Sequence, residues 1–132
     1  MKEPLVLLFI LMVSMFVVAF ICRMWAVKFS STKLSHYEIF KASTEPAYVT
    51  KTTNNLNNLF QLPPVFIAAC ILSFNLDYTS EALVFNAWGF VISRYIHTLV
   101  HITINTVLVR SAVMGIGLYF LIVIWIELLA RV

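Results

Sequence analysis

Four polar side chains that are able to take part in binding or catalysis recur along a stretch that is mostly apolar. They are an arginine, two histidines and an asparagine, namely Arg94, His97, His101 and Asn105. Their separations of three, four and four residues place them on one face of a helix. A charged side chain at mid-membrane costs roughly 2.5–3.5 kcal/mol, so such groups tend to face a cavity or a partner. The spacing therefore predicts a polar stripe that lines a working site.

The two histidines allow more than one interpretation. His97 and His101 lie one helical turn apart, as metal-binding pairs do. No carboxylate or third histidine lies near them in the sequence, and Arg94 would repel a cation. Hydrogen bonding or ligand contact by neutral imidazoles therefore fits the pair better, and no metal site is predicted. Arg94 is either a ligand contact or an internal tie to Gln61, Asn58 or a backbone carbonyl.

A second polar stripe comes just before two consecutive prolines. Asn54, Asn58 and Gln61 are spaced by four and three residues and share a helix face. Pro63 and Pro64 have no amide hydrogen to donate, so they are expected to kink the helix that carries them.

The composition indicates what kind of protein carries these stripes. Of 132 residues, 61% are hydrophobic and 11% are charged. A soluble domain averages about 45–50% apolar and about 25% charged residues, so the chain is predicted to be an integral membrane protein. The net charge of +3 is scattered, which argues against a nucleic-acid partner. Cys22 and Cys70 form no C-x-x-C motif.

Four segments are long enough to cross a membrane core of ~30 Å. The predicted helices cover residues about 5–27, 45–75, 82–107 and 111–130. The second starts near Thr44-Glu45-Pro46, because too few residues follow the two prolines to make a span. The first is too long for a cleaved signal peptide. The predicted fold is all-α, an integral membrane bundle of four transmembrane helices running up and down, in one domain of residues 1–132.

The distribution of basic residues predicts the orientation. The first loop carries four lysines and the third carries an arginine, namely Lys28, Lys33, Lys41, Lys51 and Arg110. The positive-inside rule places these loops in the cytoplasm and both termini on the other side. Arg110 and Ser111 are expected at the turn into the fourth helix. Arg110 is either an anchor to lipid phosphates or a site residue, and Ser111 is either a helix cap or a site residue. Glu127 is expected to reach the interface or pair with Arg131.

Two sequence blocks together resemble the MAPEG family, the membrane-associated proteins in eicosanoid and glutathione metabolism. The first block, N-x-x-[E/Q]-x-x-P, runs from Asn58 to Pro64. The second, R-x-x-H-T-x-x-[Y/H] followed by R-[S/A], runs from Arg94 to Ser111. Its spacing is close to that of microsomal glutathione transferase and microsomal prostaglandin E synthase.

The resemblance implies a homotrimer that holds glutathione between adjacent subunits. Arg94, His97 and His101 would form the wall of the glutathione site, and Asn58 and Gln61 its floor. Arg110 would face the glutathione sulfur with Ser111 beside it. A fixed cation lowers the pKa of a thiol, and arginine cannot give up its own proton. A lipophilic electrophile or hydroperoxide would arrive from the lipid bilayer.

The chain departs from the family pattern on the second helix. Asn54 and Asn57 stand where active members usually have arginines, and Gln61 replaces the customary glutamate. Met114 occupies a position that is often aromatic. Each lost hydrogen bond to a charge costs about 1.5–3 kcal/mol, which Lys51 or Lys28 could offset in part.

These departures leave three hypotheses open. The first is a glutathione transferase or peroxidase for lipophilic compounds. The second is a non-catalytic or glutathione-independent homologue that binds a lipid or small anion, as the resemblance to bacterial inner-membrane members without a clear activity implies. The third is a small multidrug transporter, which needs a membrane-embedded acid such as Glu127. A multi-pass location in a bacterial inner membrane is expected.

Overall fold

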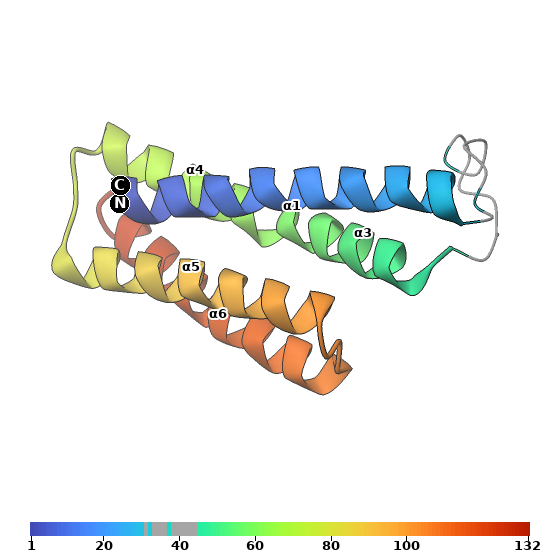
Figure 1. The fold of residues 1–132 in the computed structure, drawn as a ribbon. Coiled ribbons are helices and arrows are strands. Elements are labelled where there is room, and N and C mark those ends of the chain that lie inside the picture. Colours follow the sequence, from blue (N-terminus) through green and yellow to red (C-terminus); the bar gives the residue numbers. More distant parts are fainter. Residues whose placement is uncertain (31, 33–36, 38–44) are drawn as a thin grey trace.

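The computed structural model describes residues 1–30, 32, 37 and 45–132, and the regular elements within these ranges are helices (Figure 1). They are α1 (Lys2–Phe29), α3 (Ala47–Leu59), α4 (Leu62–Asn75), α5 (Glu81–Ile102) and α6 (Val107–Leu129). The α3–α4 pair returns along α1, and α6 returns along α5 (Figure 1). The prediction of an all-helical bundle is therefore confirmed.

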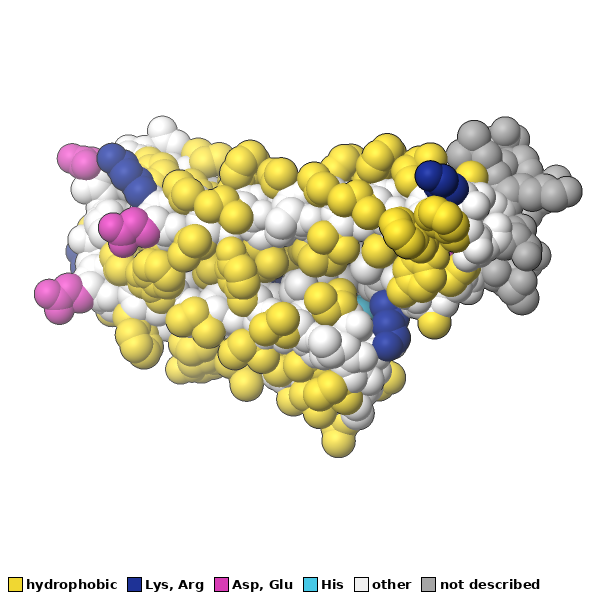
Figure 2. All heavy atoms as spheres, in the orientation of Figure 1, with side chains coloured by type: hydrophobic (Ala, Val, Ile, Leu, Met, Phe, Trp, Pro, Cys, Tyr) yellow, Lys and Arg dark blue, Asp and Glu magenta, His cyan; other side chains and the backbone are white. Residues whose placement is uncertain are grey.

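Three helical stretches are long and apolar enough to cross a membrane, namely α1, the joined stretch Ala47–Asn75 and α6. α5 does not meet the same test because it carries many polar residues. Beyond Glu81 in its first turn, however, its Asn, Ser, Thr, His and Arg residues are buried, whereas its exposed large hydrophobic side chains are Phe85, Ile92, Ile96 and Leu99. Apolar side chains also cover much of the length of the visible face (Figure 2). The protein is therefore a membrane protein whose polar helix turns its polar side inward.

The kink expected at the two prolines lies between α3 and α4. α3 ends at Leu59, and the N–H groups of Phe60 and Gln61 donate to carbonyls three residues back at 3.1 and 3.2 Å. Pro63 and Pro64 then lie in the first turn of α4, where a missing N–H costs little. The prolines thus divide the predicted helix into two.

The third helix ends earlier than predicted, which removes Asn105 from the polar stripe. α5 stops at Ile102 rather than near residue 107. Asn105 adopts a φ of 55°, a left-handed conformation that asparagine tolerates better than most residues. Its N–H donates to the carbonyl of Val100 at 2.7 Å and closes the turn. The helical spacing of Asn105 therefore did not indicate its position.

The start of the fourth helix also differs from the prediction. α6 begins at Val107 with Thr106 in the N-cap position. Arg110 and Ser111 therefore lie inside the helix rather than in the turn before it, and Ser111 does not cap it. Near the other end of α6, Glu127 accepts hydrogen bonds from the hydroxyl groups of Tyr78 and Ser80, and Arg131 donates to Tyr78 rather than to Glu127.

The start of α3 lies close to the predicted place. Pro46 occupies the N-cap position and Ala47 is the first helical residue. Glu45 precedes the helix and accepts a hydrogen bond from the hydroxyl of Thr50 at 3.4 Å. Thr44, Lys33 and Lys41, which the sequence analysis singled out, lie outside the described residues.

The core consists of two clusters along the bundle. The larger lies around the α4, α5 and α6 contacts, where the rings of Phe66 and Phe90 stack with centroids 4.7 Å apart. The smaller joins α1 to α3 and is made by Leu11, Met15, Ala19, Leu56 and Leu59. The polar end of α5 lies beside the smaller cluster, because α3 packs against both α1 and α5.

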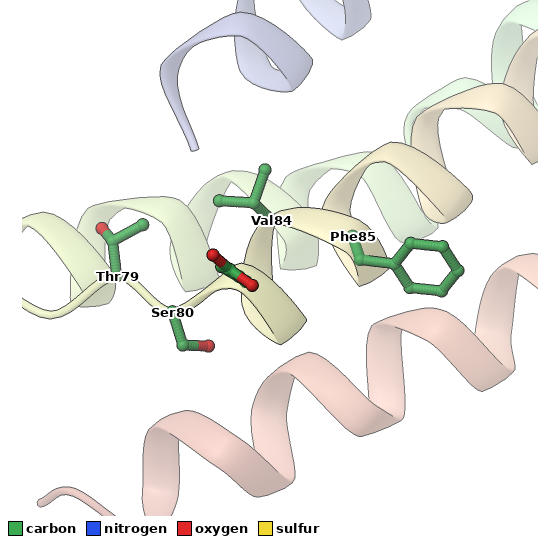
Figure 3. Close-up of a pocket in the computed structure, with 5 residues that line it drawn as sticks. Thr79, Ser80, Val84 and Phe85 are labelled. Carbon is green, nitrogen blue, oxygen red and sulfur yellow. The ribbon is translucent and has the colours of Figure 1, made fainter.

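A hydroxyl cluster joins the α4–α5 turn to the end of α6. The Ser80 hydroxyl donates to Glu127 and accepts from the N–H of Leu83 at 2.9 Å, so it also caps α5. The Tyr78 hydroxyl donates to Glu127 at 3.1 Å and accepts from Arg131 at 3.2 Å. Figure 3 shows Ser80 directed toward α6 and Thr79 directed away from it.

We expect Ser80→Ala to lower the stability of the protein by about 1 kcal/mol, because the substitution removes a helix cap and a partner of Glu127. Thermal unfolding in detergent would measure the change. The exposed neighbour Thr79 provides the control, since Thr79→Ala should leave the midpoint unchanged. Equal midpoints for the two variants would contradict the role of Ser80.

Candidate functional site

A cavity of about 360 Å³ lies among α3, α5 and α6. It is lined by four residues of the two sequence blocks, Asn58, His97, Arg110 and Ser111, and by three further residues of α6, Met114, Gly115 and Leu118. α3 packs on α1 and α5, whereas α6 packs on α5 and α4. The cavity thus forms where α5 holds α3 and α6 on either side. Polar residues far apart in the sequence meet there.

Arg110 supplies a positive charge to this cavity. Its Nη1 donates to the Oδ1 of Asn105 at 2.7 Å, which is its one hydrogen bond within the described part of the chain. A guanidinium has five N–H donors in a fixed fork, so further donors are available to a ligand. Asn105 therefore positions the guanidinium of Arg110, and its left-handed backbone conformation directs its side-chain amide toward that group.

Arg94 does not line the cavity but ties α5 to α6. Its side chain is 1% exposed. Nη1 donates to the Sδ of Met114 at 3.1 Å, and Nη2 lies 3.4 and 3.5 Å from the carbonyls of Met114 and Val113. Nε lies 3.4 Å from the Ser93 hydroxyl. Of the two interpretations, the structure supports an internal tie, and the partners are on α6 rather than Asn58 or Gln61.

Gly117 makes the tie possible. A Cβ at this position would collide with Nη2 of Arg94 and with the Ser93 hydroxyl. A Cβ at Gly115, by contrast, would meet nothing within 4 Å. The two glycines therefore differ: Gly117 leaves the space that the Arg94 guanidinium occupies, and Gly115 faces open space at one wall of the cavity.

The two histidines occupy neighbouring positions on the buried face of α5. His97 lines the cavity, and the centroids of its ring and the His101 ring are 5.6 Å apart. His101 is 1% exposed, and neither of its ring nitrogens has a hydrogen-bond partner among the described residues. The described residues also contain no cluster of three metal-ligating side chains. The pair therefore places imidazole nitrogens beside a cavity whose wall carries the Arg110 guanidinium.

Two buried residues beside the histidines were missed by the sequence analysis. Asn55 is fully buried, and its Nδ2 lies 3.4 Å from the Thr98 hydroxyl, which joins α3 to α5. Asn55 is one residue away from the predicted stripe, so its burial depends on how α3 is rotated. Thr98 belongs to the R-x-x-H-T motif, which could have indicated it.

The remaining predicted residues lie away from the cavity. Asn54 and Gln61 are exposed, as is Asn57. Lys51 donates to the carbonyl of Thr103 at 3.0 Å and so closes the end of α5. Of the second stripe only Asn58 lines the cavity. Within a single chain, Asn54, Gln61 and Lys51 do not line the cavity. Their binding roles stay predictions.

Comparison with known proteins identifies the family. The model of the MAPEG family matches residues 3–130. The chain belongs to the MAPEG family. This membership agrees with both sequence blocks and is consistent with a glutathione-related function in a membrane. A search of curated proteins and a search of solved structures found no match.

Gly117→Ala is expected to destabilise the protein by about 1–3 kcal/mol, because the added methyl group displaces the buried Arg94. Gly115→Ala is the matched control, since it adds the same methyl group to the same helix in open space. Alanine also favours a helix over glycine, so this control should unfold at an unchanged or higher temperature. Equal loss of stability in both variants would refute the proposed seat for Arg94.

Proposed function

We propose that the protein is a membrane-bound glutathione transferase or glutathione-dependent peroxidase that acts on lipophilic electrophiles. The observation that carries this proposal is the position of Arg110, in the wall of a cavity that also contains His97, Asn58 and Ser111. No acidic residue is among the described lining residues. A fixed cation without a neighbouring carboxylate favours an anionic ligand or a thiolate.

The chemistry follows from this charge. An unperturbed thiol is only a few per cent thiolate at neutral pH, and a nearby cation lowers the pKa of the thiol. Arg110 keeps its own proton, so it stabilises the thiolate without acting as an acid. The adjacent Ser111 hydroxyl is able to donate a second hydrogen bond to sulfur. The thiolate would then attack an electrophile or a peroxide oxygen that enters from the lipid.

The proposal includes a homotrimer with the glutathione site between subunits. Asn54, Asn57 and Gln61 present exposed amide groups on a helical stretch long enough to cross a membrane. Amides without hydrogen-bond partners are costly in an apolar medium, so a second copy of the chain would stabilise this face. Ser111 and Gly115 are also exposed, which leaves one wall of the cavity open to a neighbouring subunit.

The proposed orientation places the cavity at the cytoplasmic end of the bundle in a bacterial inner membrane. Acidic side chains gather at the end where both termini lie (Figures 1 and 2). Lys28, Lys51 and Arg110 belong to loops or helix ends at the opposite end (Figure 1). The positive-inside rule supports this orientation, with both termini outside the cytoplasm.

A glutathione-independent homologue that binds a lipid or small anion is the second candidate. The supporting observation is that, in the part of the chain that the structure describes, no cationic side chain lines the cavity on its α3 side. Asn54 and Asn57 are neutral and exposed, and Lys51 is bonded to α5. A ligand with one negative charge would need only Arg110.

Titration with glutathione at pH 7 tests the first candidate. The purified protein should bind glutathione and give a stoichiometric thiolate absorbance signal in the ultraviolet. Arg110→Gln should reduce the thiolate to the few per cent found for a free thiol, because the stabilising cation is lost. Arg131→Gln is the control, since Arg131 contacts Tyr78 at the other end of α6 and should keep the full signal.

Retention of the thiolate signal in Arg110→Gln would contradict the role of Arg110. No binding of glutathione by the folded, unsubstituted protein would instead favour the second candidate. Native mass spectrometry of the protein extracted from its membrane would then look for a bound lipid or anion that Arg110→Gln releases.

A further inference from the structure

We propose that the thioether of Met114 is a modification site, converted to the sulfoxide by lipophilic hydroperoxides that enter the cavity. Met114 lines the cavity together with Arg110 and Ser111, and its side chain is half-buried. Its sulfur also accepts a hydrogen bond from Arg94 at 3.1 Å. The inference deepens the proposed function and rests on one part of it, the entry of a hydroperoxide into this cavity. It does not require glutathione.

The other four methionines have different surroundings. Met1 and Met15 are buried in the two apolar clusters, and Met12 packs against both clusters. Met24 is 44% exposed on α1 and has no hydrogen bond to its sulfur within the described part of the chain. Met114 thus combines access to a cavity with a polar environment, and Met24 provides a reference for a sulfur that is simply accessible.

The reaction transfers one oxygen atom. A lone pair of the Met114 sulfur attacks the terminal oxygen of the hydroperoxide, so an S–O bond forms as the O–O bond breaks. The proton on the terminal oxygen passes to the departing alkoxide, which leaves as an alcohol. Sulfur is oxidised by two electrons and the hydroperoxide is reduced. Arg110 is able to donate to the departing oxygen, and the Ser111 hydroxyl can both accept and donate the moving proton.

Arg94 offers the product a better partner than it offers the thioether. A thioether sulfur is a weak acceptor, whereas a sulfoxide is polar. Arg94 is 1% exposed, and its contacts with carbonyl oxygens are long, at 3.4 and 3.5 Å. After rotation about the Cγ–Sδ bond, the sulfoxide oxygen can accept a charge-assisted hydrogen bond from this guanidinium. The site therefore accommodates an oxidation that disrupts an ordinary apolar core.

The same contact determines which sulfoxide forms. Sulfur has two lone pairs, and attack through one or the other gives opposite epimers. The Arg94 N–H occupies one of them, so the hydroperoxide meets the other. Met114 should therefore give a single epimer. Met24 has no such neighbour and should give both.

The test treats the full-length protein in lipid nanodiscs with cumene hydroperoxide and no glutathione. Proteolysis and mass spectrometry then follow sulfoxide formation at all five methionines. Met114 should be oxidised about five-fold faster than Met24, or more. In the digest, a methionine sulfoxide reductase specific for one epimer should reduce nearly all or nearly none of the Met114 sulfoxide, but about half of the Met24 sulfoxide.

A Met114 rate no greater than that of Met24, or equal amounts of both Met114 epimers, overturns the proposal. Arg110→Gln should lower the Met114 rate to that of Met24, whereas Arg131→Gln should change neither rate. An unchanged Met114 rate in folded Arg110→Gln protein also overturns it.

If Arg110→Gln does not fold, the epimer ratio of the Met114 sulfoxide in the unsubstituted protein, compared with that of Met24, decides whether the proposal holds. Since no glutathione is added, the result is separate from the thiolate titration. If the unsubstituted protein gives no thiolate signal with glutathione, that result counts against the transferase or peroxidase proposal only.

Discussion

The burial of Arg94, which has no carboxylate partner among the described residues, constrains the α5–α6 half of the bundle. A guanidinium in a membrane interior needs hydrogen-bond acceptors, and α6 supplies them through the carbonyls of Val113 and Met114 and the sulfur of Met114. Helical carbonyls have a second lone pair, so they can accept from Arg94 while staying in their own helix. α6 must approach closely for this, and Gly117 permits the approach. The tie therefore fixes the register in which α6 faces α5.

That register brings the site together. With α6 fixed against α5, the residues on the preceding turn of α6 lie beside His97, and Arg110 and Ser111 line the cavity with it. Arg94 itself does not line the cavity, whereas Met114, whose sulfur accepts a hydrogen bond from Arg94, does. One arginine thus assembles the site and a second one supplies its charge. The two roles are separate even though both arginines belong to the same sequence motif.

The sequence predicted the features that depend on local geometry or on composition. The helical spacing of Arg94, His97 and His101 put them on a common buried face, and the paired prolines placed the kink. The apolar composition indicated a membrane bundle. The predicted end of α5 was wrong because apolar residues continue past Ile102 and Asn105 keeps the helical spacing. A left-handed residue in a closing turn leaves no periodic signal in a sequence.

The composition of the cavity could not be predicted from the same patterns, because it depends on how far the helices diverge. Asn54, Asn58 and Gln61 share a predicted face, yet only Asn58 lines the cavity, since the kink begins after Leu59 and no α3–α6 contact brings the others in. The described lining therefore takes its charge from α6 alone. Coulomb attraction weakens with distance, so this charge acts most strongly on a ligand group that lies next to Arg110. A negatively charged group far from Arg110 would gain little from this charge, and the α3 residues Asn54 and Asn57 add no second one.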